Sequence, residues 1–298
     1  MNIALIGLGQ ISVLYDYNRF SNTVLSHLKG IYLNNLNLKY ISDVTILNVS
    51  KVKRFFPNVK FIPNYRELKR YKDIDLLVIA TPTYTHYKIL NYFKNSKIDK
   101  ILIEKPLFFK KNKIKKFQKK DIIINYIRNF EPTIKKRLDE INQNDIQKIV
   151  FKYSKGLIHN GSHFFHLLFE YFNVSIKNFN LLNKVDNETF DMFLETDKFP
   201  VFLLGFDENR YSIWEIEIFL NNRLILIKDF SREIQIYEVV NDLEYDGYKM
   251  LNTIPKTTCT KMSRIMFYVY KNLDKKRFLS NEYKMLKFYE RMSDEISN

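Results

Sequence analysis

The stretch Ile3-Ala4-Leu5-Ile6-Gly7-Leu8-Gly9-Gln10-Ile11-Ser12 decides the fold of this chain of 298 residues. It begins with a continuous apolar run, which is typical of a strand buried on both faces of a sheet. The run ends in the pattern Gly7-x-Gly9-x-x-Ser12, and the residues after it are compatible with a helix down to Gly30. A strand, a glycine turn and a helix in this order predict the phosphate-binding turn of a dinucleotide site, and a purely structural turn is the alternative.

Glycine is scarce elsewhere in the chain, which makes the positions that keep it informative. There are 7 glycines, whereas average usage predicts about 20 in a chain of this length. Two lie at Gly7 and Gly9, and two more at Gly156 and Gly161. In the first pair, Gly7 permits a tight turn and Gly9 lets a pyrophosphate approach the backbone. Ser12 is small enough for close packing between helix and strand.

Further strands and helices alternate in the first part of the chain. Apolar runs predict strands at 38–42, 75–80, 100–103 and 122–126, and the residues 84–94 predict a helix. Strands and helices alternating at this spacing indicate βαβ units and a doubly wound parallel sheet. We therefore predict a Rossmann domain over residues 1–127.

The pattern changes after about residue 145. A strand is predicted at 147–153, and from residue 188 apolar residues recur at every second position, most clearly in Trp214-Glu215-Ile216-Glu217-Ile218. Asn221-Asn222 predicts a turn, and strands at 224–228 and 233–239 follow it. This indicates an antiparallel meander, with closing helices at 257–273 and 281–296. The α/β Rossmann domain is thus followed by a predicted α+β domain over 128–298, with a mostly antiparallel sheet that serves substrate binding and oligomerisation.

Composition excludes several classes of protein. A single cysteine, Cys259, excludes a disulfide framework and a Cys-rich metal site. No apolar run approaches the roughly 18 residues that a membrane span requires, and the N-terminus lacks the features of a signal peptide. The expectation is a cytoplasmic protein with no membrane partner.

The net charge of +15 comes from 48 Lys and Arg against 33 Asp and Glu. Lysines crowd residues 110–120, where a surface for nucleic acid or a solvated helix face are the alternatives. No nucleic-acid motif accompanies them, so the solvated face is favoured and no nucleic-acid partner is expected. A positive field also favours an anionic substrate.

Polar residues follow three of the predicted strands, at the edge where open α/β sheets bind ligands. Asp43 can accept hydrogen bonds from ribose hydroxyls and repel a 2′-phosphate, which favours NAD over NADP without excluding NADP; a loop-capping aspartate is the alternative. Thr81-Pro82 and Glu104-Lys105-Pro106 end the strands at 75–80 and 100–103. An ammonium such as that of Lys105 can polarise a substrate oxygen beside a cofactor, and a surface lysine is the alternative.

Three of the chain's 5 histidines, His159, His163 and His166, lie close together in the sequence. They can ligate zinc with Glu170, supply acid–base chemistry, or simply pack. Gly161 interrupts the spacing and places His159 in a loop, so no metal is expected. His163 is the favoured acid–base residue, and His166 is expected in the core.

Taken in order, Gly7 to Ser12, Thr81-Pro82 with His86, Glu104-Lys105-Pro106 and the segment 156–166 resemble the glucose-fructose oxidoreductase / inositol 2-dehydrogenase / rhizopine catabolism (Gfo/Idh/MocA) family of NAD(P)-dependent oxidoreductases. The resemblance implies that Lys105 is the catalytic lysine and that His163 accepts or donates the proton. It places on the cofactor side Gly7, Gly9, Gln10, Ile11, Ser12, Thr81, Pro82, His86 and Glu104. It places on the substrate side Tyr126, Arg128, His159 and Asn160.

Two residues depart from the family pattern, because His159 and His166 stand where the family has aspartates. The charge balance around Lys105 is then expected to differ, which alters the choice of substrate or weakens the dehydrogenase. The segment from Lys155 to His163 resembles members found with bacterial surface-sugar biosynthesis.

The family resemblance implies hydride transfer between nicotinamide and a hydroxyl or keto carbon of a sugar, here a nucleotide-linked sugar of surface-glycan biosynthesis. It also implies a homodimer or homotetramer. Two alternatives are a non-catalytic NAD-binding or sensor protein and a zinc enzyme built on the histidine cluster.

Overall fold

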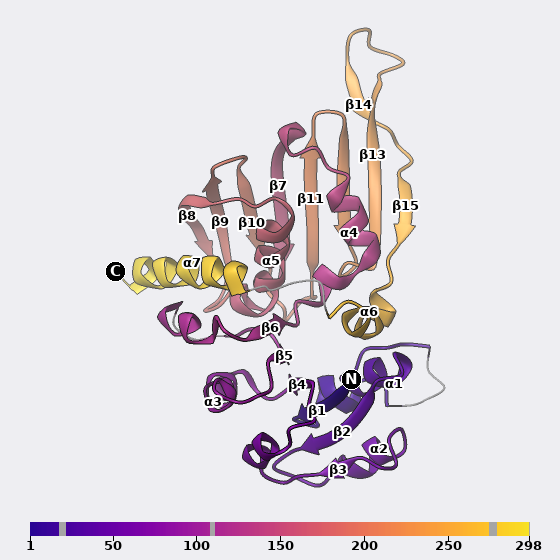
Figure 1. Ribbon diagram of the computed structural model, residues 1–298. Coiled ribbons are helices and arrows are strands. Elements are labelled where there is room, and N and C mark those ends of the chain that lie inside the picture. The colour runs from indigo at the N-terminus through magenta and orange to yellow at the C-terminus, as the bar shows by residue number, and fades with distance from the viewer. Residues whose placement is uncertain (18–21, 108–110, 274–278, 298) are drawn as a thin grey trace. The chain divides into compact units, whose positions relative to one another are not determined.

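The computed structural model describes residues 1–17, 22–107, 111–273 and 279–297 (Figure 1). The chain forms two compact units, Met1–Phe130 together with Ser263–Asn298, and Glu131–Met262. The last segment was predicted to belong with the second domain, but it packs within the first unit. The cause is apolar burial: α6 (Ile265–Lys271) packs on α1 (His27–Leu33), and α7 (Leu279–Ser297) packs near β6 (Asp121–Ile124).

The first unit contains a six-stranded sheet in the order β3-β2-β1-β4-β5-β6. Every neighbouring pair in it is parallel. Its strands are β1 (Asn2–Ile6), β2 (Asn37–Ser42), β3 (Lys60–Phe61), β4 (Leu76–Ile79), β5 (Lys100–Ile103) and β6. The strand order reverses between β1 and β4, as in doubly wound dinucleotide-binding folds. The predicted parallel sheet is confirmed, with β3 as an additional short edge strand.

The helices of this unit are mostly short. They are η1 (Gln10–Leu14), α1, α2 (Val49–Lys53), η2 (Tyr65–Arg70), α3 (Thr83–Phe93), η3 (Lys111–Phe117), η4 (Ile127–Phe130), α6 and α7. The helix predicted from the glycine turn to Gly30 is interrupted, since the π-helix η1 ends at Leu14, residues 22–26 are not helical and α1 starts at His27. Residues 18–21 of the predicted helix lie outside the described residues. The buried carboxylate of Asp16 accepts hydrogen bonds from the backbone N–H groups of Leu25 and Ser26. It thereby holds the chain in a new helix start instead of a continuous helix.

The lysine-rich segment is a solvated face only in part. Lys115, Lys116 and Lys119 are exposed. Lys120 is buried, and its Nζ donates to the carbonyl oxygens of Ser96 and Ile98 at 2.7 and 2.8 Å. Lys110 lies outside the described residues. The prediction of a solvated face is therefore wrong for Lys120, which closes the loop that precedes β5.

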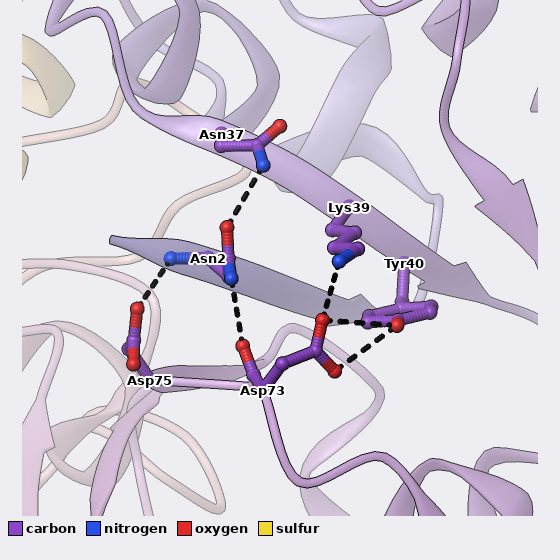
Figure 2. Close-up of polar contacts among 6 residues, drawn as sticks. All are labelled: Asn2, Asn37, Lys39, Tyr40, Asp73 and Asp75. Atoms are coloured by element: carbon purple, nitrogen blue, oxygen red, sulfur yellow. Dashed lines mark hydrogen bonds and ion pairs between the residues drawn. The ribbon is translucent and has the colours of Figure 1, made fainter.

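A polar network ties together the amino ends of the first strands (Figure 2). The backbone N–H of Asn2 donates to Asp75 Oδ2 at 2.7 Å, and its side-chain amide donates to the carbonyl oxygen of Asp73 at 2.9 Å. Asn37 Nδ2 donates to Asn2 Oδ1 at 2.8 Å. The hydrogen bond from Lys39 lowers the pKa of the Asp73 carboxyl below its usual value, and a bond from Tyr40 adds to this. The network lies at the opposite ends of the strands from the candidate site, so its role is structural.

The second unit contains a nine-stranded sheet in the order β14-β13-β12-β11-β7-β10-β9-β8, with β15 paired to β13. Its strands are β7 (Ile146–Tyr153), β8 (Ile176–Lys184), β9 (Phe190–Thr196), β10 (Val201–Gly205), β11 (Trp214–Leu220), β12 (Arg223–Lys228), β13 (Glu233–Asn241), β14 (Lys249–Leu251) and β15 (Lys256–Cys259). Only β7 and β10 pair in parallel among the described strands of this sheet. The predicted mostly antiparallel sheet is confirmed.

Two helices, α4 (Pro132–Asp139) and α5 (Ser162–Tyr171), lie on one face of this sheet (Figure 1). Phe164 of α5 stacks on Phe151 of β7, with ring centroids 4.4 Å apart. The alternating residues Trp214, Ile216 and Ile218 pair with β7 on this same face and are buried. Their apolar alternation is therefore accounted for by helices of this chain.

The helix predicted at 257–273 is wrong at its start. Residues Lys256–Cys259 form β15, which pairs with β13, and the short 3-10 helix η7 (Met262–Arg264) precedes α6. Two consecutive β-branched residues, Thr257 and Thr258, favour the strand. Among the described residues, no helix combines the length and the apolar character that crossing a membrane requires.

Candidate active site

Gly7 turns the chain sharply where β1 ends. Its φ is +91°, and a Cβ at this position would lie 2.5 Å from the carbonyl oxygen of Ala80. No other residue fits this turn without moving the backbone that follows β4. The turn therefore lies at the reversal of strand order, where open α/β sheets bind their ligands.

Open space borders Gly9, the second glycine of the turn. A Cβ at Gly9 would meet no atom within 4 Å. Gln10 is exposed and Ile11 is half-buried, and both lie in the first turn of η1. Ser12 is fully buried, as a small packing residue requires, and its Oγ has no hydrogen-bond partner among the described residues. This arrangement fits a pyrophosphate seated against the backbone at Gly9.

Asp43 at the end of β2 holds the glycine turn in place. Its Oδ2 accepts a hydrogen bond from the backbone N–H of Leu8 at 2.6 Å, and its Oδ1 accepts one from that of Thr45 at 2.9 Å. Asn48 adds a second tie, because its Nδ2 donates to the carbonyl oxygen of Leu8 at 2.7 Å. Asp43 is half-buried. Asp43 therefore caps this loop in the structure. A contact with a ribose would use lone pairs of the Asp43 carboxylate that these hydrogen bonds leave available.

His86 braces the loops that follow β4 and β5. Its Nε2 lies 2.8 Å from the carbonyl oxygen of Thr81, and its Nδ1 lies 3.1 Å from that of Pro106. Burial lowers the pKa of His86, although the two carbonyl contacts oppose this. The Thr81 hydroxyl contacts the Thr85 hydroxyl at 2.6 Å, and Pro82 is the N-cap residue of α3. These residues shape the ligand-binding edge of the sheet.

Glu104 and Lys105 form the chemical centre of this edge. Burial lowers the pKa of Lys105 to about 8; the charge of Glu104 opposes this effect and that of Arg128 adds to it. Glu104 Oε1 accepts a hydrogen bond from Asn125 Nδ2 at 2.5 Å and lies 2.9 Å from His27 Nε2. The sequence did not single out His27 or Asn125, and nothing in their local pattern distinguishes them.

The two substrate-side residues of this unit are both buried. Burial lowers the pKa of the Arg128 guanidinium to about 9. The hydroxyl of Tyr126 donates to Glu282 Oε2 of α7 at 2.9 Å. Arg128 thus contributes a buried positive charge near Lys105, whereas Tyr126 contacts the C-terminal helix.

The second unit carries the three clustered histidines, His159, His163 and His166. Gly156, with φ +76°, opens the π-helix η6 (Gly156–Gly161), which contains the exposed His159 and the half-buried Asn160. The carbonyl oxygen of Asn160 accepts a hydrogen bond from Trp214 Nε1 at 3.1 Å, and its side chain donates to Ser154 at 2.8 Å. His163 and His166 are buried in α5. No group of His, Cys, Asp and Glu residues suited to a metal ion occurs among the described parts of the chain.

A parallel sheet of order 3-2-1-4-5-6 with a glycine turn at its switch point defines a dinucleotide-binding protein of the Rossmann class. Residues 1–120 match the family GFO_IDH_MocA, described as an oxidoreductase family with an NAD-binding Rossmann fold. This match agrees, over the N-terminal part of the chain, with the family resemblance that the motifs predicted.

Solved structures share the fold of the whole chain. The dehydrogenase MviM from Clostridium difficile is 16% identical with a TM-score of 0.70, and the match covers 100% of this chain and 98% of that one. UDP-N-acetylglucosamine 3-dehydrogenase GnnA from Acidithiobacillus ferrooxidans is 14% identical with a TM-score of 0.68, covering 96% and 94%. A super-repressor mutant of Gal80p from Saccharomyces cerevisiae is 13% identical with a TM-score of 0.69, covering 91% and 82%. No curated protein sequence matches the chain.

Proposed function

We propose that this protein is an NAD-dependent oxidoreductase that transfers a hydride between nicotinamide and a hydroxyl or keto carbon of a nucleotide-linked sugar. One observation carries the proposal: Lys105, whose pKa burial lowers to about 8, follows β5 in the sheet whose switch point holds the glycine turn. An amine that exchanges its proton near neutral pH at this edge suits the chemistry of a reacting hydroxyl.

The cofactor would be held by the backbone around Gly9 and by Asp43. The open space over Gly9 accommodates the pyrophosphate, and the Asp43 carboxylate favours ribose hydroxyls over a 2′-phosphate. When bound, the nicotinamide supplies or accepts the hydride. We propose NAD as the cofactor, with NADP as the alternative.

Lys105 and His163 carry the proton chemistry in this proposal. In oxidation, His163 takes the proton of the substrate hydroxyl, and the protonated Lys105 donates a hydrogen bond to the oxygen as negative charge develops. In reduction the same two groups act in the opposite direction. His163 lies in α5, where the residue is 4% exposed.

Charge supports an anionic substrate. The chain has a net charge of +15, and Arg128 adds a buried guanidinium close enough to Lys105 to affect its pKa. A nucleotide sugar carries a diphosphate, and GnnA is itself named a UDP-N-acetylglucosamine 3-dehydrogenase. We place the reaction in surface-glycan biosynthesis in the cytoplasm and the protein in a homodimer or homotetramer.

The experiment is to incubate the protein with NAD and a panel of UDP-linked sugars and to follow nicotinamide absorbance. We expect turnover with at least one of them. Lys105→Ala should abolish turnover and leave NAD affinity, measured by calorimetry, within a few-fold of the wild type, while Lys115→Ala, at an exposed position, serves as the matched control. Unchanged turnover in Lys105→Ala would contradict the mechanism.

A second candidate is a non-catalytic NAD-binding protein. It is favoured by His159 and His166, which replace the family's aspartates, and by the fold shared with the repressor Gal80p. NAD binding with no turnover of any sugar in the same assay would support this candidate over the enzyme.

A further inference from the structure

A buried polar cluster adjoins Lys105. It consists of His27 at the start of α1, Glu104 after β5, Asn125 after β6 and Tyr270 of α6, and we name it the His27 cluster. The exposed fractions of His27, Asn125 and Tyr270 are 0%, 1% and 4%. Two side chains from other segments of the first unit, His27 and Asn125, thus contact the carboxylate of the residue preceding Lys105, and Tyr270 contacts His27.

Both ring nitrogens of His27 are engaged. Nδ1 lies 2.7 Å from the Tyr270 hydroxyl, and Nε2 lies 2.9 Å from Glu104 Oε1. The amide of Asn125 donates to this same carboxylate oxygen at 2.5 Å. Two ring contacts of opposite kinds, a hydroxyl and a carboxylate, fix the direction in which the imidazole points.

The hydroxyl and the carboxylate assign a proton to each of these two contacts. Burial raises the pKa of Tyr270 well above its usual value, so the phenol keeps its proton and can donate to Nδ1. The ring nitrogen Nε2, which faces the carboxylate, then carries a proton and donates it to Glu104 Oε1. Burial by itself raises the pKa of Glu104, but the hydrogen bond and the charge of His27, the hydrogen bond from Asn125 and the positive charge of Lys105 lower it below the usual value.

We propose that His27 is a positioning residue, which holds the Glu104 carboxylate ionised and fixed beside Lys105 and so keeps the Lys105 amine cationic in the folded protein. Tyr270 is the second positioning residue, because its hydroxyl fixes the ring of His27. The two act through Glu104 and are not themselves catalytic.

Other charged and titratable groups also affect Lys105 and its surroundings. Arg128 of η4 and burial both disfavour the ammonium of Lys105, and the charge of Glu104 is the influence that favours it. His86 of α3 is affected by the charges of both Glu104 and Glu282 of α7. Since Lys105 has two influences against its charge, the ionisation and placement of Glu104 decide the pH at which the amine loses its proton.

The catalytic consequence of this inference rests on the proposed function, in which a protonated Lys105 stabilises the developing alkoxide. The effect on the amine itself does not require turnover. The test is therefore made on the amine.

The experiment is trace acetylation of the full-length protein with acetic anhydride across a pH series, with the extent of labelling at Lys105 read by peptide mass spectrometry. Only the neutral amine reacts, so the midpoint reports the loss of the Lys105 proton. We expect a midpoint near pH 8 in the wild type. Glu104→Gln should lower it by about one pH unit, the size of effect that a neighbouring opposite charge exerts.

The variants of His27 separate positioning from simple packing. His27→Ala should lower the midpoint in the same direction as Glu104→Gln, whereas His27→Gln retains an amide donor for Glu104 and should restore it toward the wild-type value. Tyr270→Phe removes only the hydroxyl, and it provides a second variant if His27→Ala does not fold by circular dichroism. Labelling of the exposed Lys115 is the internal control and should not change.

The inference would be overturned if the labelling midpoint of Lys105 in His27→Ala equalled that of the wild type. It would also be overturned if Glu104→Gln had the same midpoint as the wild type. So would equal shifts in His27→Ala and His27→Gln, because loss of packing would then be the cause. Failure of the wild type to turn over any sugar would instead contradict the proposed function, and the labelling result would still decide the role of His27.

Discussion

Replacing Lys105 by methionine should stabilise the protein at neutral pH while abolishing its proposed activity. The pKa of this lysine falls from 10.5 to about 8 on folding, chiefly because the amine is buried. That difference corresponds to about 3.4 kcal/mol at most, at about 1.36 kcal/mol for each pH unit. Lys105 is half-buried, so solvent reduces the effect, and we expect Lys105→Met to raise the free energy of unfolding by about 1–3 kcal/mol at pH 7.

The stability advantage of Lys105→Met should depend on pH in a defined direction. Below pH 8 the amine is charged in both states, and the full cost of a buried ammonium opposes folding. Between pH 8 and 10.5 the folded state has released the proton that the unfolded state still binds, so stability rises with pH and the cost fades. The advantage of methionine should therefore be greatest at or below pH 8 and largely gone near pH 10.5.

Urea unfolding at a series of pH values, followed by circular dichroism, measures this difference. Lys115→Met is the matched control, because it removes an exposed lysine and should change the free energy of unfolding by no more than about 0.5 kcal/mol. A Lys105→Met variant less stable than the wild type at pH 7, or an advantage that does not decline with pH, would refute the reasoning.

Three other predictions concern the turn, the cofactor and assembly. Gly7→Ala should lower the free energy of unfolding by about 3 kcal/mol, because φ is +91° and the new Cβ would lie 2.5 Å from the carbonyl oxygen of Ala80. Gly9→Ala should leave urea unfolding nearly unchanged and weaken NAD binding at least about tenfold in calorimetry. Equal behaviour of the two variants would contradict the assignment of Gly7 to the turn and of Gly9 to the pyrophosphate site. Asp43→Ala should lower the preference for NAD over NADP and cost about 1–2 kcal/mol, since two backbone N–H groups lose their acceptor; an unchanged cofactor preference would leave Asp43 a loop residue only. We propose that the homo-oligomer forms through the sheet face opposite α5, where Phe202 pairs with Phe193. Phe202→Glu should then dissociate it in light scattering, with Phe202→Leu as control; an unchanged mass would count against this interface.

Much of the first sheet could be predicted because its signals are local. Continuous apolar runs mark strands buried on both faces, and β5 is found at the predicted residues. The two-residue strand β3 has no such run, and it forms only because β2 offers it an edge. The helix start at His27 was missed for a related reason, since it depends on the carboxylate of Asp16, a contact that no helical periodicity encodes.

In the candidate site, too, local features could be predicted from the sequence and features that depend on distant contacts could not. Gly7, Gly9 and the residues after β4 and β5 act through backbone geometry and strand ends, so a motif and its order are enough to predict them. The charge state of Lys105 depends instead on where the chain returns after the second unit. The hydroxyl of Tyr270, which lies 243 residues from His27 in the sequence, contacts the ring of His27. Glu282 accepts a hydrogen bond from the hydroxyl of Tyr126. Both C-terminal helices thus contribute a polar group to the first unit, so the segment after Ser263 helps to set the chemistry around Lys105, whose own motif lies more than 130 residues earlier in the sequence.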